Sequence, residues 1–170
     1  MLKRSTALGL VMAAVGLLGT ASAGQLPAPS AEPILTITGN VAVTNANGGA
    51  AFDLDLLKGL PATTFTTTTI WTDAPHSFTG VPLATLLDAV GARGEVVHAT
   101  AINDYSIEIP VAAITADAPV VTYLMDGKPM SVRDKGPLWI LYPFDDKPEY
   151  RTEVNYSRSI WQLDRLEIED

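Results

Sequence analysis

Aromatic side chains and polar side chains gather in the second half of the chain in a way that favours binding of a flat ring. All three tryptophans and all five tyrosines lie at or after Trp71. Amide, carboxylate and guanidinium groups near them suit the donor and acceptor edges of a heteroaromatic ligand. Packing in the core or at its rim explains any one of these aromatic residues equally well. The aromatic candidates are Trp71, Tyr105, Tyr150, Tyr156 and Trp161, and the polar candidates are Asn103, Asp104, Arg151, Asn155 and Arg158.

Other kinds of chemistry have little support in the sequence. The two histidines, His76 and His98, have no partner at the spacing of metal ligands, so we expect no metal site. His98 is predicted to be structural, whereas His76 lies in a loop after Trp71 and is the better pocket candidate. No serine has the glycine-flanked strand-to-helix setting of a hydrolase nucleophile. Gly48 and Gly49 are not followed by the lysine of a phosphate-binding loop, and we expect no catalytic residue.

The composition excludes several classes of function. The chain carries a formal net charge of −8 and contains no cysteine. An acidic chain repels the phosphates of nucleic acids and anionic membranes, so we expect neither as a partner. Without cysteine there are no disulfides, no thiolate metal sites and no cysteine catalysis.

Residues 1–23 have the features of a secretory signal peptide. Lys3 and Arg4 precede an apolar stretch at 7–18, and Ala21-Ser22-Ala23 is typical of a cleavage site. Cleavage there leaves 147 of the 170 residues and changes the net charge to −10. We therefore expect a periplasmic protein with no membrane-spanning segment after cleavage.

The mature chain is predicted to be one domain, 34–170, behind a flexible lead-in at 24–33 that is rich in proline and alanine. The clearest helix lies in the stretch 80–91, where Pro82 is in the first turn, Leu83, Leu86, Leu87 and Val90 share one face, and Gly91 ends it. Asp53 is expected to cap a shorter helix. Turns are expected at Asn103-Asp104 and Asp126-Gly127, and the stretch 143–157 is expected to have little regular structure. The predicted class is therefore α+β and rich in β-structure, with short helices on a mainly non-parallel sheet system. The predicted strands are 34–38, 41–44, 63–71, 95–101, 105–109, 120–125, 138–142 and 161–168.

The order of motifs resembles the molybdopterin-binding domain of the sulfite-oxidase type, from about residue 34 to residue 168. The resemblance implies that fold. Each motif alone is weak, but five in this order are specific. They are Phe78-Thr79-Gly80-Val81-Pro82-Leu83-Ala84-Thr85-Leu86-Leu87, the run from Ala101 to Pro110, Leu124-Met125-Asp126-Gly127-Lys128-Pro129-Met130, the run from Gly136 to Pro143, and the run from Trp161 to Ile168.

The chain departs from the enzymes of that family at the residues that hold their cofactor. Those enzymes bind molybdenum through a cysteine on the strand before the Gly-x-Pro-Leu helix, where this chain has Thr66-Thr67-Thr68-Thr69-Ile70-Trp71. A threonine hydroxyl cannot replace a thiolate on molybdenum. The enzymes also commonly carry an arginine and a lysine for the cofactor phosphate, where this chain has Trp139 and Ile160. The departures suggest a retained pocket without molybdenum or phosphate.

In this respect the chain looks like small exported members of the superfamily that lack the cysteine and bind free reduced pterins. Those proteins signal pterin occupancy to an inner-membrane receptor that makes or degrades cyclic di-GMP. The resemblance implies a pterin ligand, no tightly bound cofactor, and such a receptor as partner. Asp104 is expected to pair with the amino and ring N–H groups of the pterin. The full predicted ligand set is Trp71, Asn103, Asp104, Tyr105, Arg158, Ser159 and Trp161.

Three hypotheses follow for the function. The first is periplasmic binding of a metal-free pterin with signalling to a membrane partner. The second is a molybdopterin-dependent oxidoreductase, or a component of one, with molybdopterin as cofactor. The third is a structural adaptor whose pocket is filled by its own side chains.

Overall fold

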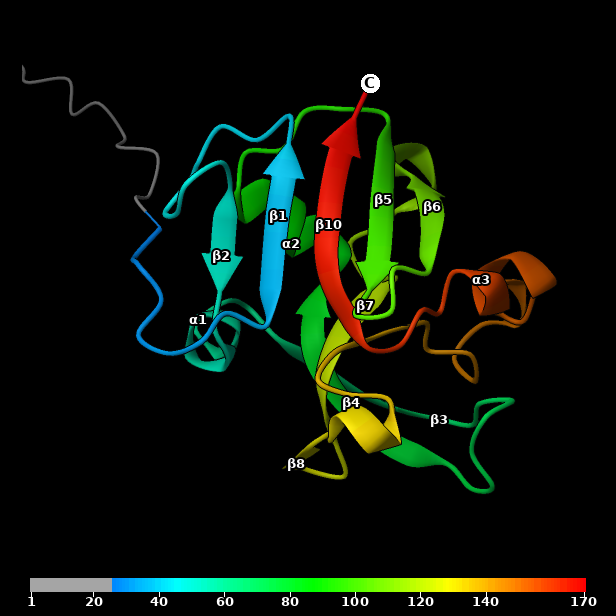
Figure 1. Ribbon diagram of the computed structural model, residues 1–170. Coiled ribbons are helices and arrows are strands. Elements are labelled where there is room, and N and C mark those ends of the chain that lie inside the picture. The colour runs from blue at the N-terminus through cyan, green and yellow to red at the C-terminus, as the bar shows by residue number, and fades with distance from the viewer. Residues whose placement is uncertain (1–25) are drawn as a thin grey trace, which may run out of the picture.

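The computed structural model describes residues 26–170 and consists of two five-stranded β-sheets with short helices beside them (Figure 1). The predicted signal segment, 1–23, lies outside the described residues. The β-rich α+β class with a mixed sheet system is confirmed. Among the residues described, no helix combines the length and the apolar character needed to span a membrane.

The first sheet has the order β2-β1-β10-β5-β6, so the last strand of the chain lies at its centre. β1 and β10 run parallel, and the other neighbouring pairs are antiparallel. Buried and exposed residues alternate in β10 from Leu166 to Glu169, as expected for a half-buried strand, and Leu163 is also fully buried because the register shifts between Leu163 and Arg165. The strands are β1 (Leu35–Gly39), β2 (Ala50–Phe52), β5 (Val96–Ala101), β6 (Ser106–Pro110) and β10 (Leu163–Glu169).

The second sheet has the order β3-β4-β7-β8, and β9 pairs with β7 on a separate path. Gly80 allows β4 and β7 to approach closely at a register shift, since a Cβ there would lie 2.2 Å from the carbonyl oxygen of Val121. The predicted tight turn at Asp126-Gly127 joins β7 to β8, and both residues have positive φ. The strands are β3 (Thr63–Thr67), β4 (His76–Pro82), β7 (Val120–Met125), β8 (Lys128–Pro129) and β9 (Trp139–Leu141).

The helices are short, and most of them join strands. The helix predicted within 80–91 forms as α2 (Leu83–Ala89), and Leu83, Leu86, Leu87 and Val90 are all buried. Pro82 is the last residue of β4 and the N-cap residue of the helix, so it does not lie in the first turn as predicted. The others are α1 (Leu54–Lys58), α3 (Glu153–Ser157), and the 3₁₀ turns η1 (Val111–Ala113), η2 (Val132–Asp134) and η3 (Pro148–Tyr150).

The molecule has two hydrophobic cores. The larger core is mainly aliphatic and contains residues of the first sheet, α1 and α2, together with second-sheet residues such as Val81, Val121 and Ile140. The smaller core is mainly aromatic and is built around Phe78, Trp139, Tyr142, Phe144 and Tyr150. Trp71 and Tyr156 pack on this aromatic core while remaining only partly buried. The aromatic core therefore extends to the surface of the molecule through Trp71 and Tyr156.

The described part of the predicted lead-in is bound to the domain through Asp53. The carboxylate of Asp53 accepts hydrogen bonds from the backbone N–H of Ser30 and Ala31 and from the Ser30 hydroxyl. It also accepts one from the backbone N–H of Leu56, so the predicted cap of α1 is confirmed. These bonds, that of Leu56 first, lower the pKa of Asp53 to about 2.

Three predicted elements were wrong in type or extent. Residues 41–44 are not a strand, because the N–H groups of Ala42 and Val43 both donate to the carbonyl of Val90 at the end of α2. β3 stops at Thr67 rather than residue 71, because the N–H of Thr68 donates to Asp145 instead of a neighbouring strand. The stretch 143–157 was expected to be irregular but contains η3 and α3, the latter capped by Thr152.

The lowered pKa of Asp53 predicts an acid-dependent contribution to stability. A carboxyl whose folded pKa lies below its unfolded value of 3.8 stabilises the fold above that pH, and the contribution disappears as pH falls toward 2. We expect Asp53→Asn to lower the free energy of unfolding at pH 7, and the gap from the unchanged protein to narrow between pH 4 and 2. Urea unfolding between pH 7 and pH 2 measures this difference in the free energy of unfolding. The control is Asp55→Asn, at an exposed position of the same helix. An equal gap at every pH would contradict the assignment.

Candidate functional site

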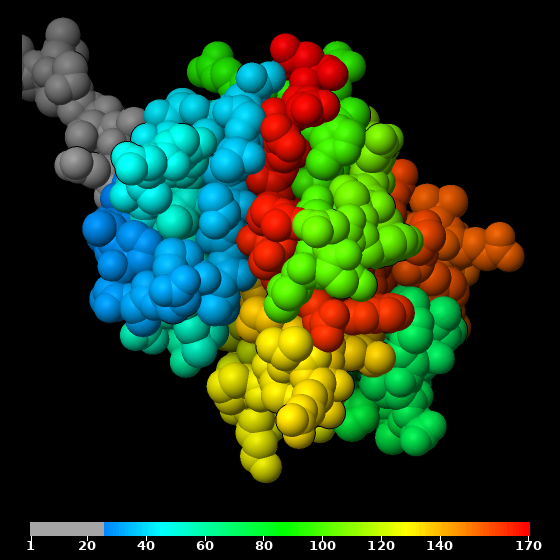
Figure 2. All heavy atoms as spheres, viewed as in Figure 1, coloured from blue at the N-terminus to red at the C-terminus, as the bar shows by residue number. Residues whose placement is uncertain are grey.

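A pocket with a volume of about 430 Å³ lies where loops from the two sheets meet α3. This size is within the usual range for sites that bind small organic molecules. In the space-filling view the segments around α3 and around the β3–β4 loop lie on the same side of the molecule (Figure 2). The described side chains leave the pocket open to solvent. Its lining residues are Trp71, Ala101, Asn103, Tyr105, Tyr156, Ser157, Ser159, Ile160 and Trp161.

Trp71 is the centre of the aromatic part of the pocket. Its ring makes edge-to-face contacts with Trp139, Tyr156 and Trp161, at centroid distances of 5.7, 6.0 and 5.8 Å. Trp139 is fully buried, whereas Trp161 is 38% exposed and Tyr105 is 57% exposed. The buried ring supports the half-buried one, and the exposed rings are left available to a ligand.

The segment just before β10 carries the last wall of the pocket and connects the two sheets. The N–H of Ile140 in β9 donates to the carbonyl of Ile160, and the N–H of Leu163 donates to the carbonyl of Leu138. On the other side, the N–H of Ile102 donates to the carbonyl of Gln162. Trp161 therefore has a position fixed by backbone bonds to both sheets.

The turn between β5 and β6 supplies Asn103 and Tyr105. The N–H of Ala101 donates to the carbonyl of Tyr105, and the N–H of Asp104 donates to the carbonyl of Ala101. The side-chain oxygen of Asn103 accepts from the N–H of Tyr105 at 3.3 Å. Asp104 has a φ of 65°, a conformation that aspartate and asparagine tolerate in turns. The predicted turn at Asn103-Asp104 is therefore confirmed.

The two serine hydroxyls in the pocket can accept hydrogen bonds but have used their own hydrogens. Ser157 Oγ donates to the carbonyl of Val154 at 2.7 Å, and Ser159 Oγ donates to the carbonyl of Asn155 at 2.8 Å. A hydroxyl oxygen keeps its accepting capacity after it has donated. A ligand with N–H donors on one edge suits these two oxygens better than a ligand with acceptors there.

Lys135 places a positive charge beside the aromatic wall. Its ammonium lies 4.7 Å from the ring centroid of Trp161 and 5.5 Å from that of Trp139. The carbonyl of Lys135 also accepts from the N–H of Gln162. This lysine is 26 residues before Trp161 in sequence, and nothing in its local pattern indicates the contact.

The structure brings five of the seven predicted ligand residues into one pocket and leaves two outside its lining. Asp104 does not line it, because its side chain is 84% exposed and forms an ion pair with Arg165. Arg158 faces a separate open hollow beside Ser106 and Val154. The five that line the pocket are Trp71, Asn103, Tyr105, Ser159 and Trp161.

The positive charge of Arg158 lies close enough to Tyr142 of the aromatic core to influence its pKa. Burial raises the pKa of Tyr142 to about 12, and the nearby charge of Arg158 opposes that rise. Among the described residues the Tyr142 hydroxyl has no hydrogen-bond partner. Neither Arg158 nor Tyr142 lines the aromatic pocket.

Sequence reasoning missed several of the pocket residues. Tyr156 was a candidate only as one aromatic among several, and its position on α3 gives no sign of the contact with Trp71. Ser157 is adjacent to the predicted ligand residue Arg158. Prediction of the helix α3 would have allowed Ser157 to be named as a pocket residue. Ala101 ends β5 and Ile160 lies in the segment before β10, and an apolar residue at such a position does not by itself indicate a pocket. Tyr150, Arg151 and Asn155 do not line the pocket.

Both histidines lie outside the pocket lining and contact carboxylates, and His76, which was expected in a loop, is the first residue of β4. His76 Nδ1 lies 2.7 Å from Asp126 Oδ2, and this contact is the main cause of the lowered pKa of Asp126. His98 Nε2 lies 3.1 Å from Glu169. In residues 26–170 there is no group of three or more histidine, aspartate or glutamate side chains that could hold a metal ion.

Comparisons with known proteins agree with this fold. A family model described as "Oxidoreductase molybdopterin binding domain" matches residues 35–144. The solved structure of the sulfane dehydrogenase SoxCD from Paracoccus pantotrophus is similar, with a TM-score of 0.60 and 20% sequence identity. That match covers 80% of this chain and 38% of the SoxCD chain, and at this identity it shows the fold alone. No curated protein matches the chain.

The central place of Trp71 predicts a spectroscopic result. Trp71 contacts both other tryptophans, so Trp71→Phe removes two indole–indole contacts, whereas Trp161→Phe removes one. We expect the near-ultraviolet circular dichroism to change more in Trp71→Phe than in Trp161→Phe, with an unchanged far-ultraviolet spectrum. An equal or smaller change in Trp71→Phe would contradict the arrangement of the rings.

Proposed function

Since the chain belongs to the oxidoreductase molybdopterin-binding domain family, we propose that its aromatic pocket binds a pterin-type heterocycle. The observation that carries this proposal is the combination of exposed rings with acceptor oxygens in one pocket. Trp161 and Tyr105 offer ring faces, and Ser157 and Ser159 offer oxygens whose hydrogens are already used.

A pterin has the shape and the polar edge that this pocket suits. It is a flat bicycle, and stacking of such a ring on aromatic side chains contributes about 1–3 kcal/mol in comparable nucleobase sites. Its amino group and ring N–H groups form a donor edge that needs acceptors. The serine oxygens take the place that was expected for the Asp104 carboxylate, which is already paired with Arg165.

The residues present do not fit a thiolate-held molybdenum centre. The sequence has no cysteine, and its threonine stretch before β4 is engaged in other bonds. Thr67 is fully buried, and its hydroxyl donates to the carbonyl of Thr68 and accepts from the N–H of Asp145. The Thr68 hydroxyl donates to the Asp145 carboxylate. A neutral threonine hydroxyl cannot replace a thiolate on molybdenum, so the proposal concerns the organic ring without the metal.

A second candidate function is a molybdopterin-dependent oxidoreductase, or one component of such an enzyme. The match to the family model favours it, because the family is described by that cofactor and by that class of reaction. The aromatic pocket would then hold the pterin part of molybdopterin, and the metal would need ligands other than a cysteine of this sequence.

The export of the chain and its signalling to a membrane partner are further parts of the proposal. Support for a protein partner comes from the exposed large apolar side chains, which lie on or near the segments around the pocket. Val132 lies near the pocket because its carbonyl accepts a hydrogen bond from the side chain of Gln162, the neighbour of Trp161. The set comprises Ile70, Ile102, Tyr105, Val132, Val154 and Trp161. A partner that covers this rim would sense whether the pocket is filled.

Titration with a reduced pterin tests the proposed ligand. We expect tetrahydrobiopterin, titrated without oxygen into the full chain, to bind and to quench tryptophan fluorescence. Trp161→Ala removes a stacking face, so its affinity should fall by about 10- to 100-fold, which corresponds to about 1.4–3 kcal/mol.

Asp104→Asn is the matched control for this titration. The residue is adjacent to Asn103 but outside the pocket lining, and asparagine tolerates its positive φ. Its affinity should stay within about twofold of the unchanged protein, because no contact with the ligand is removed. Equal affinities in all three proteins would show that the ring does not bind beside Trp161.

Metal analysis of the purified chain separates the two candidate functions. For the first function we expect pterin to co-purify with less than about one molybdenum per ten chains, because the sequence offers no thiolate to hold the metal. Elemental analysis together with fluorescence of the oxidised extract measures both. Molybdenum at one atom per chain would exclude the metal-free reading and support the oxidoreductase.

A further inference from the structure

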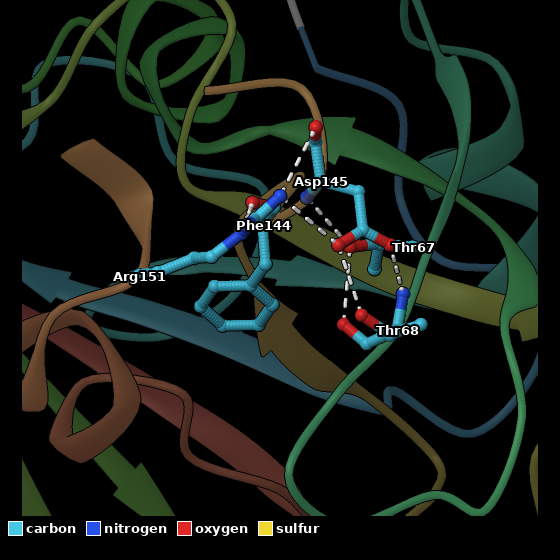
Figure 3. Close-up of polar contacts among 5 residues, drawn as sticks. All are labelled: Thr67, Thr68, Phe144, Asp145 and Arg151. Atoms are coloured by element: carbon cyan, nitrogen blue, oxygen red, sulfur yellow. Dashed lines mark hydrogen bonds and ion pairs between the residues drawn. The ribbon is translucent and has the colours of Figure 1, made fainter. Parts of the chain in front are cut away.

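Asp145 joins the end of β3 to the segment that follows β9. Its carboxylate accepts hydrogen bonds from the backbone N–H of Thr68 at 2.6 Å and from the Thr68 hydroxyl at 2.9 Å. Its own N–H donates to the Thr67 hydroxyl at 3.1 Å. Figure 3 shows the carboxylate pointing at the two threonines. Segments 77 residues apart in the sequence are therefore connected by three hydrogen bonds through one aspartate.

Arg151 extends this connection to the segment that leads into α3. Its Nε donates to the carbonyl of Phe144 at 2.7 Å, and its Nη2 lies 3.5 Å from the carbonyl of Asp145 and 3.4 Å from the carboxylate (Figure 3). We refer to Thr67, Thr68, Asp145 and Arg151 as the clasp. It joins three segments: the end of β3, the residues after β9, and the start of the α3 region.

Two aromatic walls of the pocket begin at the clasp. Trp71 is three residues after Thr68, and Tyr156 is five residues after Arg151. The ring of Phe144, the neighbour of Asp145, lies 4.8 Å from the ring of Tyr156, and Tyr156 lies 6.0 Å from Trp71. The distance between the rings of Trp71 and Tyr156 therefore depends on the clasp, because each ring is only a few residues from a clasp residue in the chain.

The charge of Asp145 suits this role. The N–H of Thr68 is the largest cause that holds the pKa of Asp145 below its usual range, so the group is an anion at neutral pH. Hydrogen bonds to a charged acceptor are stronger than neutral ones. The loop after β3 would otherwise start with an unpaired backbone N–H.

We propose that Asp145 is a positioning residue that holds Trp71 against Tyr156 and Trp161 in the geometry that binds the ligand. The proposal rests on the proposed function for the ligand, but the placement of Trp71 is independent of it. Asp145 itself does not line the pocket, so it acts through the loop that carries Trp71.

The test compares two clasp variants with two controls. Asp145→Asn removes the charge, and Thr68→Val removes one hydroxyl with nearly the same shape. Thr68→Ser restores that hydroxyl, and Asp146→Asn changes the exposed acidic neighbour, which makes no side-chain bond to the clasp. Both readouts use the full chain: affinity for tetrahydrobiopterin, and the near-ultraviolet circular dichroism of the tryptophan contacts.

We expect tetrahydrobiopterin affinity to fall about 10-fold in Asp145→Asn and several-fold in Thr68→Val, with the tryptophan signal reduced in both. Thr68→Ser and Asp146→Asn should stay within about twofold of the unchanged protein. If Asp145→Asn does not fold, Thr68→Val with its serine rescue decides the question. A role in stability alone would lower the melting temperature and leave affinity and spectrum unchanged, which would overturn the proposal.

The two readouts separate failure of this proposal from failure of the proposed function. If the unchanged protein binds the pterin and the clasp variants bind it equally well, the positioning role is excluded and the ligand stands. If the unchanged protein does not bind it, the ligand is wrong, and the spectrum still decides the placement of Trp71. A reduced tryptophan signal in Thr68→Val that Thr68→Ser restores supports the clasp, and an unaltered signal excludes it.

Discussion

β10, the last strand of the chain, lies between β1 and β5 and pairs with both, so the first sheet is incomplete until the C-terminal segment is in place. Burial of Leu163, Leu166 and Ile168 on one face stabilises this insertion, because each removes an apolar side chain from water. The residues just before β10 then have to cross from the second sheet to the first. Trp161 is in that crossing, and its position follows from the insertion of the strand.

The pocket depends on the same constraint, because it is formed by loops and strand ends from both sheets. The β5–β6 turn belongs to the first sheet, and the loop with Trp71 belongs to the second. Their separation is fixed by backbone bonds at residues 160–163 and by the clasp around Asp145. Rigid sheets with a site on their loops are a common way to hold a ligand. Here the aromatic core continues beneath that site, so Trp139 supports the ring of Trp71.

Much of the fold could be predicted from local pattern. The α2 helix, the Asp53 cap, the Asp126-Gly127 turn and most strands follow from periodicity and turn chemistry. The errors occur where a backbone N–H finds a partner far along the chain. Ala42 and Val43 donate to Val90, and Thr68 donates to Asp145, so two stretches with strand-like composition do not continue as strands. Composition shows what a segment favours but not which distant acceptor it will meet.

By itself, the sequence determined the acidic charge, the absence of cysteine, the family resemblance and the supply of aromatic residues. It also identified five residues that line the pocket, because aromatic and polar residues beside predicted loops indicate a binding site even when their contacts are not known. Only the tertiary structure decided which candidates meet. Asp104 pairs with Arg165, Arg158 approaches Tyr142, and Lys135 lies on Trp161. The two members of each pair are separated by 16 to 61 residues in the sequence. Such charge and ring contacts form only at short distance, so they depend on how the sheets pack and not on neighbours in the chain.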